Sequence, residues 1–147
     1  MKKYLVIGNP IQHSLSPKLH NIWIKENNIK AIYNKMQLDE DDIPKIIDDL
    51  KKEKVNGINV TIPFKKLVIP FLDNLTPLAK EAQSVNTIFK KENKIIGDNT
   101  DIGGFERSLF HINYSVKNKK IFILGAGGVA NSIILALKKL GVSKITL

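Results

Sequence analysis

Two serines near the N-terminus stand out in the segment HSLSP, residues 13–17, which follows closely on the apolar run of residues 3–7. Pro17 suits the first position of a helix, because its fixed φ is already helical. Ser16 is then predicted to cap this helix, since its hydroxyl can accept a hydrogen bond from a free backbone amide of the first turn. Capping explains Ser16 only, so Ser14 is a candidate for a binding role.

Three further polar clusters follow or end predicted strands: NVTIPFK at 59–65, SVNTI at 84–88 and GDNTD at 97–101. Ligand sites of open α/β sheets collect at the carboxyl ends of strands, which is where HSLSP and NVTIPFK fall. A lysine ammonium such as that of Lys65 can donate a proton to a developing alkoxide or stabilise its charge. The carboxylate of Asp101 can accept a hydrogen bond from a hydroxyl and hold an ammonium in place.

Each of these side chains also has a purely structural interpretation. Lys65 stands beside Lys66, and the two could form a solvated surface pair. Asp101 could cap a helix that begins there. Thr61 is a common type of strand residue, whereas Asn86 is less expected in a strand, where asparagine is depleted.

The segment GAGGVA, residues 125–130, fits the pattern G-x-G-x-x-G/A. Its context supports the match, because KIFIL, residues 120–124, is predicted to be a buried strand and residues 129–140 an amphipathic helix. Such a turn lets backbone amides at a helix N-terminus approach a pyrophosphate without intervening Cβ atoms. A tight turn that binds no ligand is the alternative. The candidate cofactor-binding residues are Gly125, Ala126, Gly127, Gly128, Val129 and Ala130.

The first part of the chain predicts strands and helices in alternation. Strands are expected over residues 3–7, 31–38 and 57–62. The first helix should run from Pro17 to about Asn28, with Trp23 in the core. The second helix, over residues 43–52, places four aliphatic side chains on one face. This order favours an α/β fold with a mainly parallel sheet covered by helices. The four aliphatic residues are Ile43, Ile46, Ile47 and Leu50.

Later segments predict a hairpin and a second structural unit. A short helix is expected over residues 78–83, a two-stranded hairpin over 84–99 with its turn near 91–93, and a helix from about Asp101. We expect three parts. Residues 1–101 form a catalytic domain, 102–118 a linking helix and loop, and 119–147 the start of a dinucleotide-binding domain with an incomplete Rossmann-like βαβ unit.

The composition narrows the function classes. The net charge is +9, yet nearly all of it is lysine in scattered short runs with a single arginine, so a nucleic-acid partner is not expected. There is no cysteine, and His13, His20 and His111 show no metal-binding spacing, so no metal is expected. No apolar run reaches the roughly 20 residues that cross a bilayer, and a cytoplasmic protein is expected. The sequence leaves a homodimer open.

The polar clusters and the glycine turn, taken in order, resemble the shikimate dehydrogenase family. The matching segments are NPIQHSLSP, NVTIPFK, VNT, GDNTDIGGF and GAGGVA, and together they cover the whole chain. The resemblance implies NADPH-dependent reversible reduction of 3-dehydroshikimate to shikimate, a step of aromatic amino-acid biosynthesis. The residue that separates NAD from NADP would lie past Leu147, so the sequence itself does not decide the nucleotide.

The resemblance also implies roles for the candidate residues. Ser14 and Ser16 would hold the substrate carboxylate. Thr61 and Asn86 would contact the ring hydroxyls. Lys65 and Asp101 would flank the reacting carbon as the catalytic pair, and each would also contact substrate.

One residue departs from the family pattern, and two alternative functions stay open. Ser84 stands where the family usually has a small apolar residue before VNT. The first alternative is a truncated substrate-binding fragment without hydride-transfer activity, because the family's adenosine-phosphate motif and substrate-binding glutamine would lie past Leu147. The second is a quinate/shikimate dehydrogenase, because the same site could seat a similar cyclic hydroxy acid.

Overall fold

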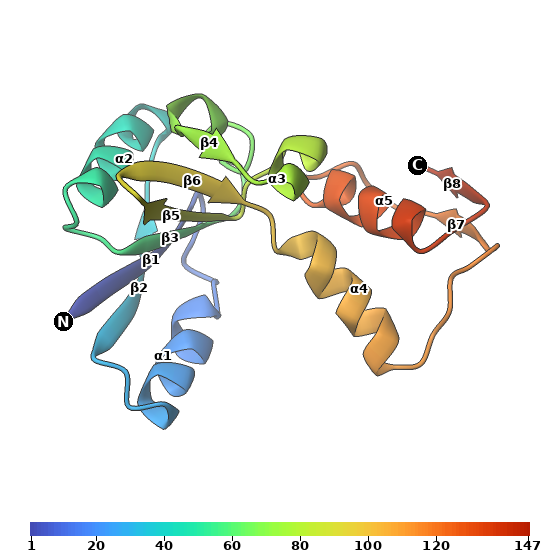
Figure 1. Ribbon diagram of the computed structural model, residues 1–147, viewed down its shortest axis with the longest axis horizontal. Coiled ribbons are helices and arrows are strands. Elements are labelled where there is room, and N and C mark those ends of the chain that lie inside the picture. The colour runs from blue at the N-terminus through green and yellow to red at the C-terminus, as the bar shows by residue number, and fades with distance from the viewer.

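A six-stranded sheet, a linking helix and a small βαβ unit make up the protein in the computed structural model, which describes all 147 residues (Figure 1). The strand order in the large sheet is β2-β1-β3-β5-β6-β4. Its strands are β1 (Lys2–Gly8), β2 (Ala31–Gln37), β3 (Gly57–Val60), β4 (Asn74–Leu75), β5 (Thr87–Lys91) and β6 (Lys94–Asp98).

The sheet is mainly parallel, as the sequence predicts. β1 pairs in parallel with β2 and β3, and β4 pairs in parallel with β6. β5 is antiparallel to both β3 and β6. The parallel strands β1, β2 and β3 require crossover connections, which α1 (Ser16–Glu26) and α2 (Ile43–Lys51) provide. The predicted α/β class is therefore confirmed.

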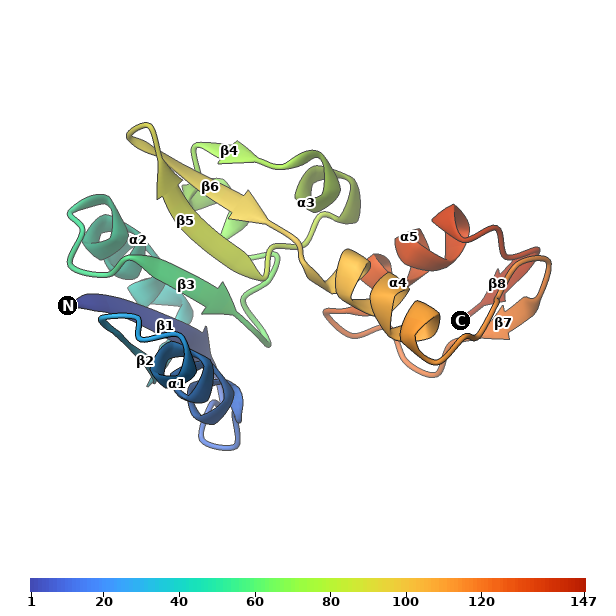
Figure 2. The same cartoon turned by 60° about the horizontal axis from the view of Figure 1, so that its bottom comes forward.

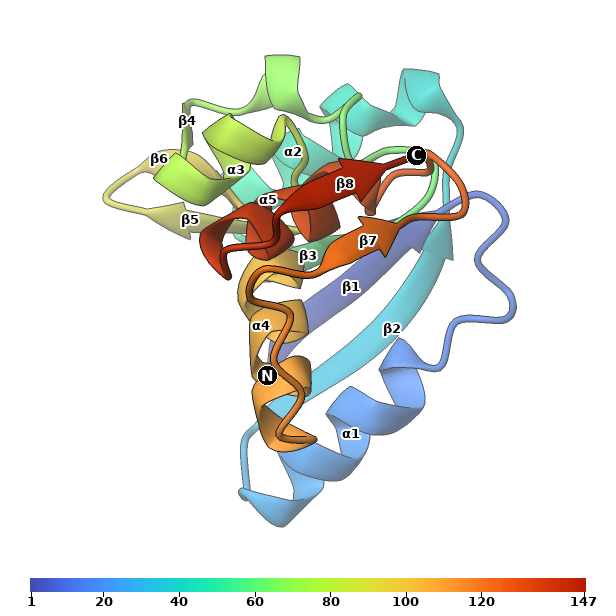
Figure 3. The same ribbon diagram turned by 90° about the vertical axis from the view of Figure 1, so that its right-hand side faces the viewer.

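The two crossover helices cover opposite faces of the sheet (Figure 3). Side chains alternate along β1, so that Leu5 and Ile7 belong to the main core cluster, which includes α2, whereas Val6 packs with Tyr33 and Ile24 below α1. All four aliphatic residues predicted for the inner face of α2 are buried. Each such burial stabilises the fold by about 1.5–3 kcal/mol.

Helix α1 packs differently from the prediction. Trp23 was expected in the core, but 48% of it is exposed, and Leu19 and Ile22 are equally open at 45% each. The face that meets the sheet is polar instead. The Asn21 side chain donates to the Tyr33 carbonyl at 2.7 Å and accepts from the Tyr33 amide at 3.0 Å. His20 stacks on the Tyr33 ring with centroids 4.1 Å apart, and these contacts fix the rotation of the helix.

The hairpin β5–β6 turns at Glu92 and Asn93, as predicted. Both residues have positive φ, 50° and 62°, which matches the twist of a two-residue hairpin loop. Before it, Thr76 accepts a hydrogen bond from the Ala79 amide at 3.3 Å and so caps α3 (Pro77–Ala82). Two short 3₁₀ turns complete this part, η1 (Glu40–Asp42) and η2 (Ile69–Phe71).

Helix α4 (Asp101–His111) leads from the large sheet to the βαβ unit of β7 (Lys120–Phe122), α5 (Ala130–Lys139) and β8 (Lys144–Thr146) (Figure 2). β7 and β8 are parallel, as a Rossmann-like unit requires. Ile102 of α4 and Ala136 of α5 are buried in a shared apolar cluster with Ala82. The linking helix therefore packs against the second unit.

The prediction of a buried strand over residues 120–124 is wrong in part. The strand forms, but 65% of Phe122 and 88% of Leu124 are exposed. The reason is that β7 and β8 form a two-stranded sheet that α5 covers on one face (Figure 3). No helix of the protein has the length and apolar character needed to cross a membrane.

Candidate active site

Lys65 and Asp101 form a short ion pair. The Lys65 Nζ atom lies 2.6 Å from Asp101 Oδ2, and the two side chains are only 13% and 23% exposed. Lys65 lies in the turn that follows β3, and Asp101 is the first residue of α4. A carboxylate in the first turn of a helix also interacts favourably with the helix dipole. The interpretation of Lys65 as one of a solvated surface pair is therefore wrong.

Asn86 completes the group around Asp101. Its Nδ2 donates to Asp101 Oδ1 at 2.8 Å, so both carboxylate oxygens have partners. Its Oδ1 accepts from the Thr100 amide at 3.0 Å, which fixes the orientation of the Asn86 side chain. The structure thus brings together Lys65, Asn86 and Asp101 from three separate segments.

The cap of α4 is not Asp101. Asn99 Oδ1 accepts from the amides of Asp101 at 3.1 Å and Ile102 at 3.3 Å, so that the Asp101 carboxylate is free to face Lys65. The sequence prediction missed Asn99. Its position two residues before the helix, in GDNTD, is a signal that could have identified it.

Ser14, Ser16 and Thr61 line one hollow of about 330 Å³ at the carboxyl ends of β1 and β3. His13 lines it as well, together with Ile62. The predicted cap is wrong here too: the Ser16 amide donates to Ser14 Oγ at 3.4 Å, and Ser16 has no capping bond of its own.

Tyr33 and Asn59 form a hydrogen-bonded chain that ends at Asn86 and Thr87. The Tyr33 hydroxyl donates to Asn59 Oδ1 at 2.6 Å. Asn59 Nδ2 in turn donates to the Asn86 carbonyl at 3.2 Å and to Thr87 Oγ1 at 3.1 Å. Burial raises the pKa of Tyr33, and the hydrogen bond with Ser16 opposes this shift.

The sequence prediction missed both connecting residues. Asn59 could have been identified from the sequence, because asparagine is unusual in a strand. Tyr33 could not, because nothing in the local pattern of β2 distinguishes it from an ordinary core tyrosine.

The glycine turn lies against Lys65. A Cβ atom on Gly128 would be 3.9 Å from Lys65 Cδ, whereas a Cβ on Gly125 or Gly127 would meet no atom within 4 Å. Gly125 has φ +99°, which a residue with a side chain rarely adopts. Val129, which precedes α5, makes no side-chain cap, so no protein side chain satisfies the first amides of the helix. This open turn fits the phosphates of a dinucleotide.

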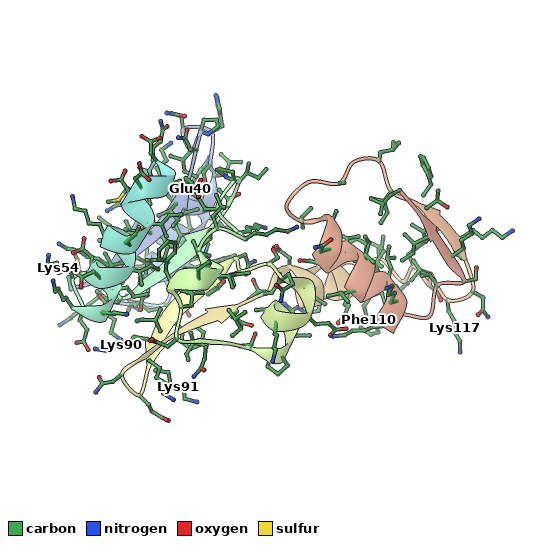
Figure 4. All side chains as sticks on the ribbon, turned by 90° about the horizontal axis from the view of Figure 1, so that it is seen from above. Glu40, Lys54, Lys90, Lys91, Phe110 and Lys117 are labelled. Carbon is green, nitrogen blue, oxygen red and sulfur yellow. The ribbon has the colours of Figure 1, made fainter.

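The remaining charges are spread over the surface. Lys54, Lys90 and Lys91 lie at one end of the molecule and Lys117 at the other (Figure 4). No group of three or more His, Cys, Asp or Glu side chains is placed to hold a metal ion. The absence of a metal and of a nucleic-acid partner both stay predictions.

The fold and the site define an α/β protein in which a polar small-molecule site lies beside the first turn of a Rossmann-like unit. The family model described as the shikimate dehydrogenase substrate binding domain matches residues 6–88, which is more than half of the chain. The chain belongs to this family.

Similar proteins extend the comparison to nearly all of the chain. The shikimate dehydrogenase (NADP(+)) of Pelagibacter ubique strain HTCC1062 is 60% identical over 146 residues, which are 99% of this chain and 55% of that protein. The crystal structure of shikimate dehydrogenase from Aquifex aeolicus is 40% identical with a TM-score of 0.92, covering 99% of this chain and 55% of the other.

A third similar structure, shikimate 5-dehydrogenase from Thermus thermophilus in complex with NADP(H) and shikimate, is 28% identical with a TM-score of 0.90 and covers 99% of this chain and 55% of the other. The chain thus spans about half the length of the curated relatives that it matches.

Proposed function

We propose that this chain contributes the substrate site and the first nucleotide-binding turn of an NADP-dependent shikimate dehydrogenase, which reduces 3-dehydroshikimate to shikimate. The observation that carries this proposal is the Lys65–Asp101 ion pair, held by Asn86 and lying against Gly128 of the glycine turn. Family membership and the NADP(+)-dependent relatives support the same function.

The roles of the residues follow from their chemistry. NADPH supplies the hydride that is added to the carbonyl carbon. The oxygen of that carbonyl then needs a proton or a cation, and the Lys65 ammonium provides either. Asp101 holds the ammonium in position and accepts a hydrogen bond from a substrate hydroxyl.

The hollow lined by Ser14, Ser16 and Thr61 holds the rest of the substrate. The hydroxyls of Ser14 and Ser16 donate to the substrate carboxylate, and Thr61 and Asn86 contact the ring hydroxyls. The hollow of about 330 Å³ supports the assignment of Ser14, Ser16 and Thr61, which line it. The role of Asn86 is supported by its hydrogen bond to Asp101. The Lys65 and Asp101 side chains are largely shielded from water, which favours proton transfer to the substrate oxygen.

Replacing Lys65 tests the proposal. In the full-length protein that contains this chain, Lys65→Ala should lower the turnover of shikimate by at least about 100-fold, because the proton donor is lost. Shikimate binding, measured by NMR titration, should persist. Lys66→Ala, at the exposed neighbouring position, is the matched control. Normal turnover in Lys65→Ala would show that the role assigned to Lys65 is wrong.

A substrate-binding fragment without hydride transfer is the second candidate, and the coverage of about half of each relative favours testing it. Shikimate titrated into the 147-residue chain should shift the NMR signals of Ser14, Thr61 and Asn86. A nucleotide absorbance assay on the same sample separates the candidates, since NADPH-dependent turnover eliminates the fragment function. Comparing quinate with shikimate as substrates tests the broader specificity.

The remaining expectations belong to the same proposal. We place the domain boundaries at 1–101, 102–118 and 119–147, and limited proteolysis should cut within residues 112–119, which form no helix or strand.

A homodimer is supported by the exposed apolar stripe on α1, which includes Leu19 and Trp23, and light scattering tests it. A cytoplasmic location is proposed from the family's biosynthetic role and is tested by cell fractionation.

A further inference from the structure

The buried polar residues of the protein gather at one place. Ser84, Asn99 and Ser132 are 0%, 1% and 0% exposed, and they are the only polar residues among the 31 buried ones. They come from three segments: the loop before β5, the end of β6 and helix α5. These segments meet where α4 leaves the large sheet (Figure 2).

Asn99 is the centre of this cluster and uses its whole side chain. Its Nδ2 donates to the Ser84 carbonyl at 2.8 Å and to Ser132 Oγ at 2.9 Å. Its Oδ1 accepts from the amides of Asp101 and Ile102. An amide offers two donors and two acceptor positions, so all of its hydrogen-bonding capacity is satisfied.

Further bonds tie the cluster to the glycine turn. Ser84 Oγ donates to the Gly128 carbonyl at 3.3 Å. Next to Ser132, Asn131 Nδ2 donates to the Ala82 carbonyl at 3.3 Å. The loop at residues 82–84 is therefore bonded both to the turn and to the helix that follows it.

We propose that Asn99 is a positioning residue that sets the distance between Asp101 and the glycine turn. One end of its amide fixes the first turn of α4, which carries Asp101, and the other end fixes α5 through Ser132. Because a buried polar group without a partner is costly, a shift of α5 away from α4 is disfavoured. This inference rests on the proposed function for its catalytic meaning.

The kinetic test uses Ser132→Ala in the full-length protein. Loss of the bond to Asn99 should raise the KM for NADPH about fivefold, the effect of one hydrogen bond, and leave the KM for shikimate unchanged. The kcat should fall about 10-fold or more, because small misplacements of the reacting groups strongly slow the chemical step. A merely structural role would reduce the folded fraction and leave both KM values unchanged.

The control is Ser108→Ala, which removes an exposed hydroxyl on α4 that bonds only to the Phe105 carbonyl, and it should change neither KM. If Ser132→Ala does not fold, Ser132→Cys gives the same readout, because the thiol fills the same space but is only a weak acceptor for Asn99 Nδ2. An unchanged KM for NADPH in the folded variant would overturn the proposal.

Hydrogen exchange provides a readout that needs no turnover. In Asn99→Ala, the amides of Asp101 and Ile102 should exchange at least about 10-fold faster, because they lose their acceptor. The Gly104 amide, which donates to the Thr100 carbonyl at 2.9 Å, should be unaffected and serves as the internal control. Unchanged exchange at Asp101 and Ile102 would refute the positioning role. An inactive wild-type protein with the expected exchange pattern would refute only the proposed function.

Discussion

At the scale of single residues, Tyr33 is a buried side chain that bonds to Asn59, which in turn bonds to the backbone carbonyl of Asn86. It is 3% exposed, its ring stacks on His20, and its hydroxyl donates to Asn59. The neutral phenol is favoured in this position because burial disfavours the phenolate. The ionisation of Tyr33 is therefore linked to the stability of the site.

This linkage predicts how stability depends on alkaline pH. Burial raises the pKa of Tyr33, so the folded protein keeps the proton at a pH where the unfolded chain loses it. The stabilisation is complete below about pH 10, the ordinary tyrosine value, and is lost as the pH rises above it. In urea unfolding from about pH 8 to 11, Tyr33→Phe should cost about 1 kcal/mol at pH 8 and progressively less above pH 10.

The matched control is Tyr114→Phe, at a position that is 50% exposed. The free energy of unfolding of Tyr114→Phe should differ from that of the wild type by the same amount over the whole pH range. A constant difference for Tyr33→Phe as well would contradict the linkage.

The sequence predicted part of the site and not the contacts inside it. Lys65, Asn86 and Asp101 are predicted at strand ends, and the topology brings these ends together. Lys65 and Asp101 follow the carboxyl ends of β3 and β6, whereas Asn86 precedes β5, which is antiparallel to both. The sequence assigns the capping roles to Ser16 and Asp101, each two residues after the side chain that accepts the amides. Such small offsets depend on φ and ψ at the helix start, which residue types alone do not determine.

At the scale of elements, the two crossover helices show when an apolar pattern is enough to predict which face of a helix is buried. The apolar face of α2 was predicted correctly because four aliphatic residues leave one choice of inner face. In α1 the apolar residues were misleading, because the Asn21 side chain pairs with both backbone groups of Tyr33 and turns the polar face inward. Specific hydrogen bonds to an edge strand thus outweigh a weak apolar stripe.

Helix α4 offers a prediction at this scale. Gly104 lies exposed in its interior, and a Cβ added there would meet no atom within 4 Å. Gly104→Ala should therefore raise the free energy of unfolding by up to about 1 kcal/mol, the difference in helix propensity. Urea unfolding measures it.

The contrasting variant is Gly97→Ala in β6. A Cβ there would be 2.5 Å from Leu72 Cδ1 and 2.9 Å from Leu75 Cδ2, inside the packed core. Overpacking should lower the free energy of unfolding by about 1–3 kcal/mol. If both substitutions had the same sign, the local space around each glycine would not be what decides its effect.

At the scale of the whole molecule, the proposed site draws on both structural units. The large sheet supplies the hydroxyl hollow and Lys65, and the βαβ unit supplies the glycine turn that lies against this lysine. The alternation of strands and helices predicted the α/β class of the large sheet, which is confirmed. The exposure of β7 could not be predicted, because it depends on what packs over the second face of a two-stranded sheet.

Under the proposed function, shikimate and NADPH contact different units, so their binding should be separable. Gly127→Ala adds a methyl group where no protein atom lies within 4 Å, so the fold should be retained. The same methyl group would stand where phosphate oxygens approach the backbone amides, and the Kd for NADPH should rise by about 10-fold or more. Shikimate affinity, followed by NMR titration, should stay as in the wild type.

Ser14→Ala should show the reverse pattern, with weaker shikimate binding and normal NADPH binding. Equal weakening of both ligands by Gly127→Ala would mean that the substitution disturbs the fold rather than the nucleotide turn.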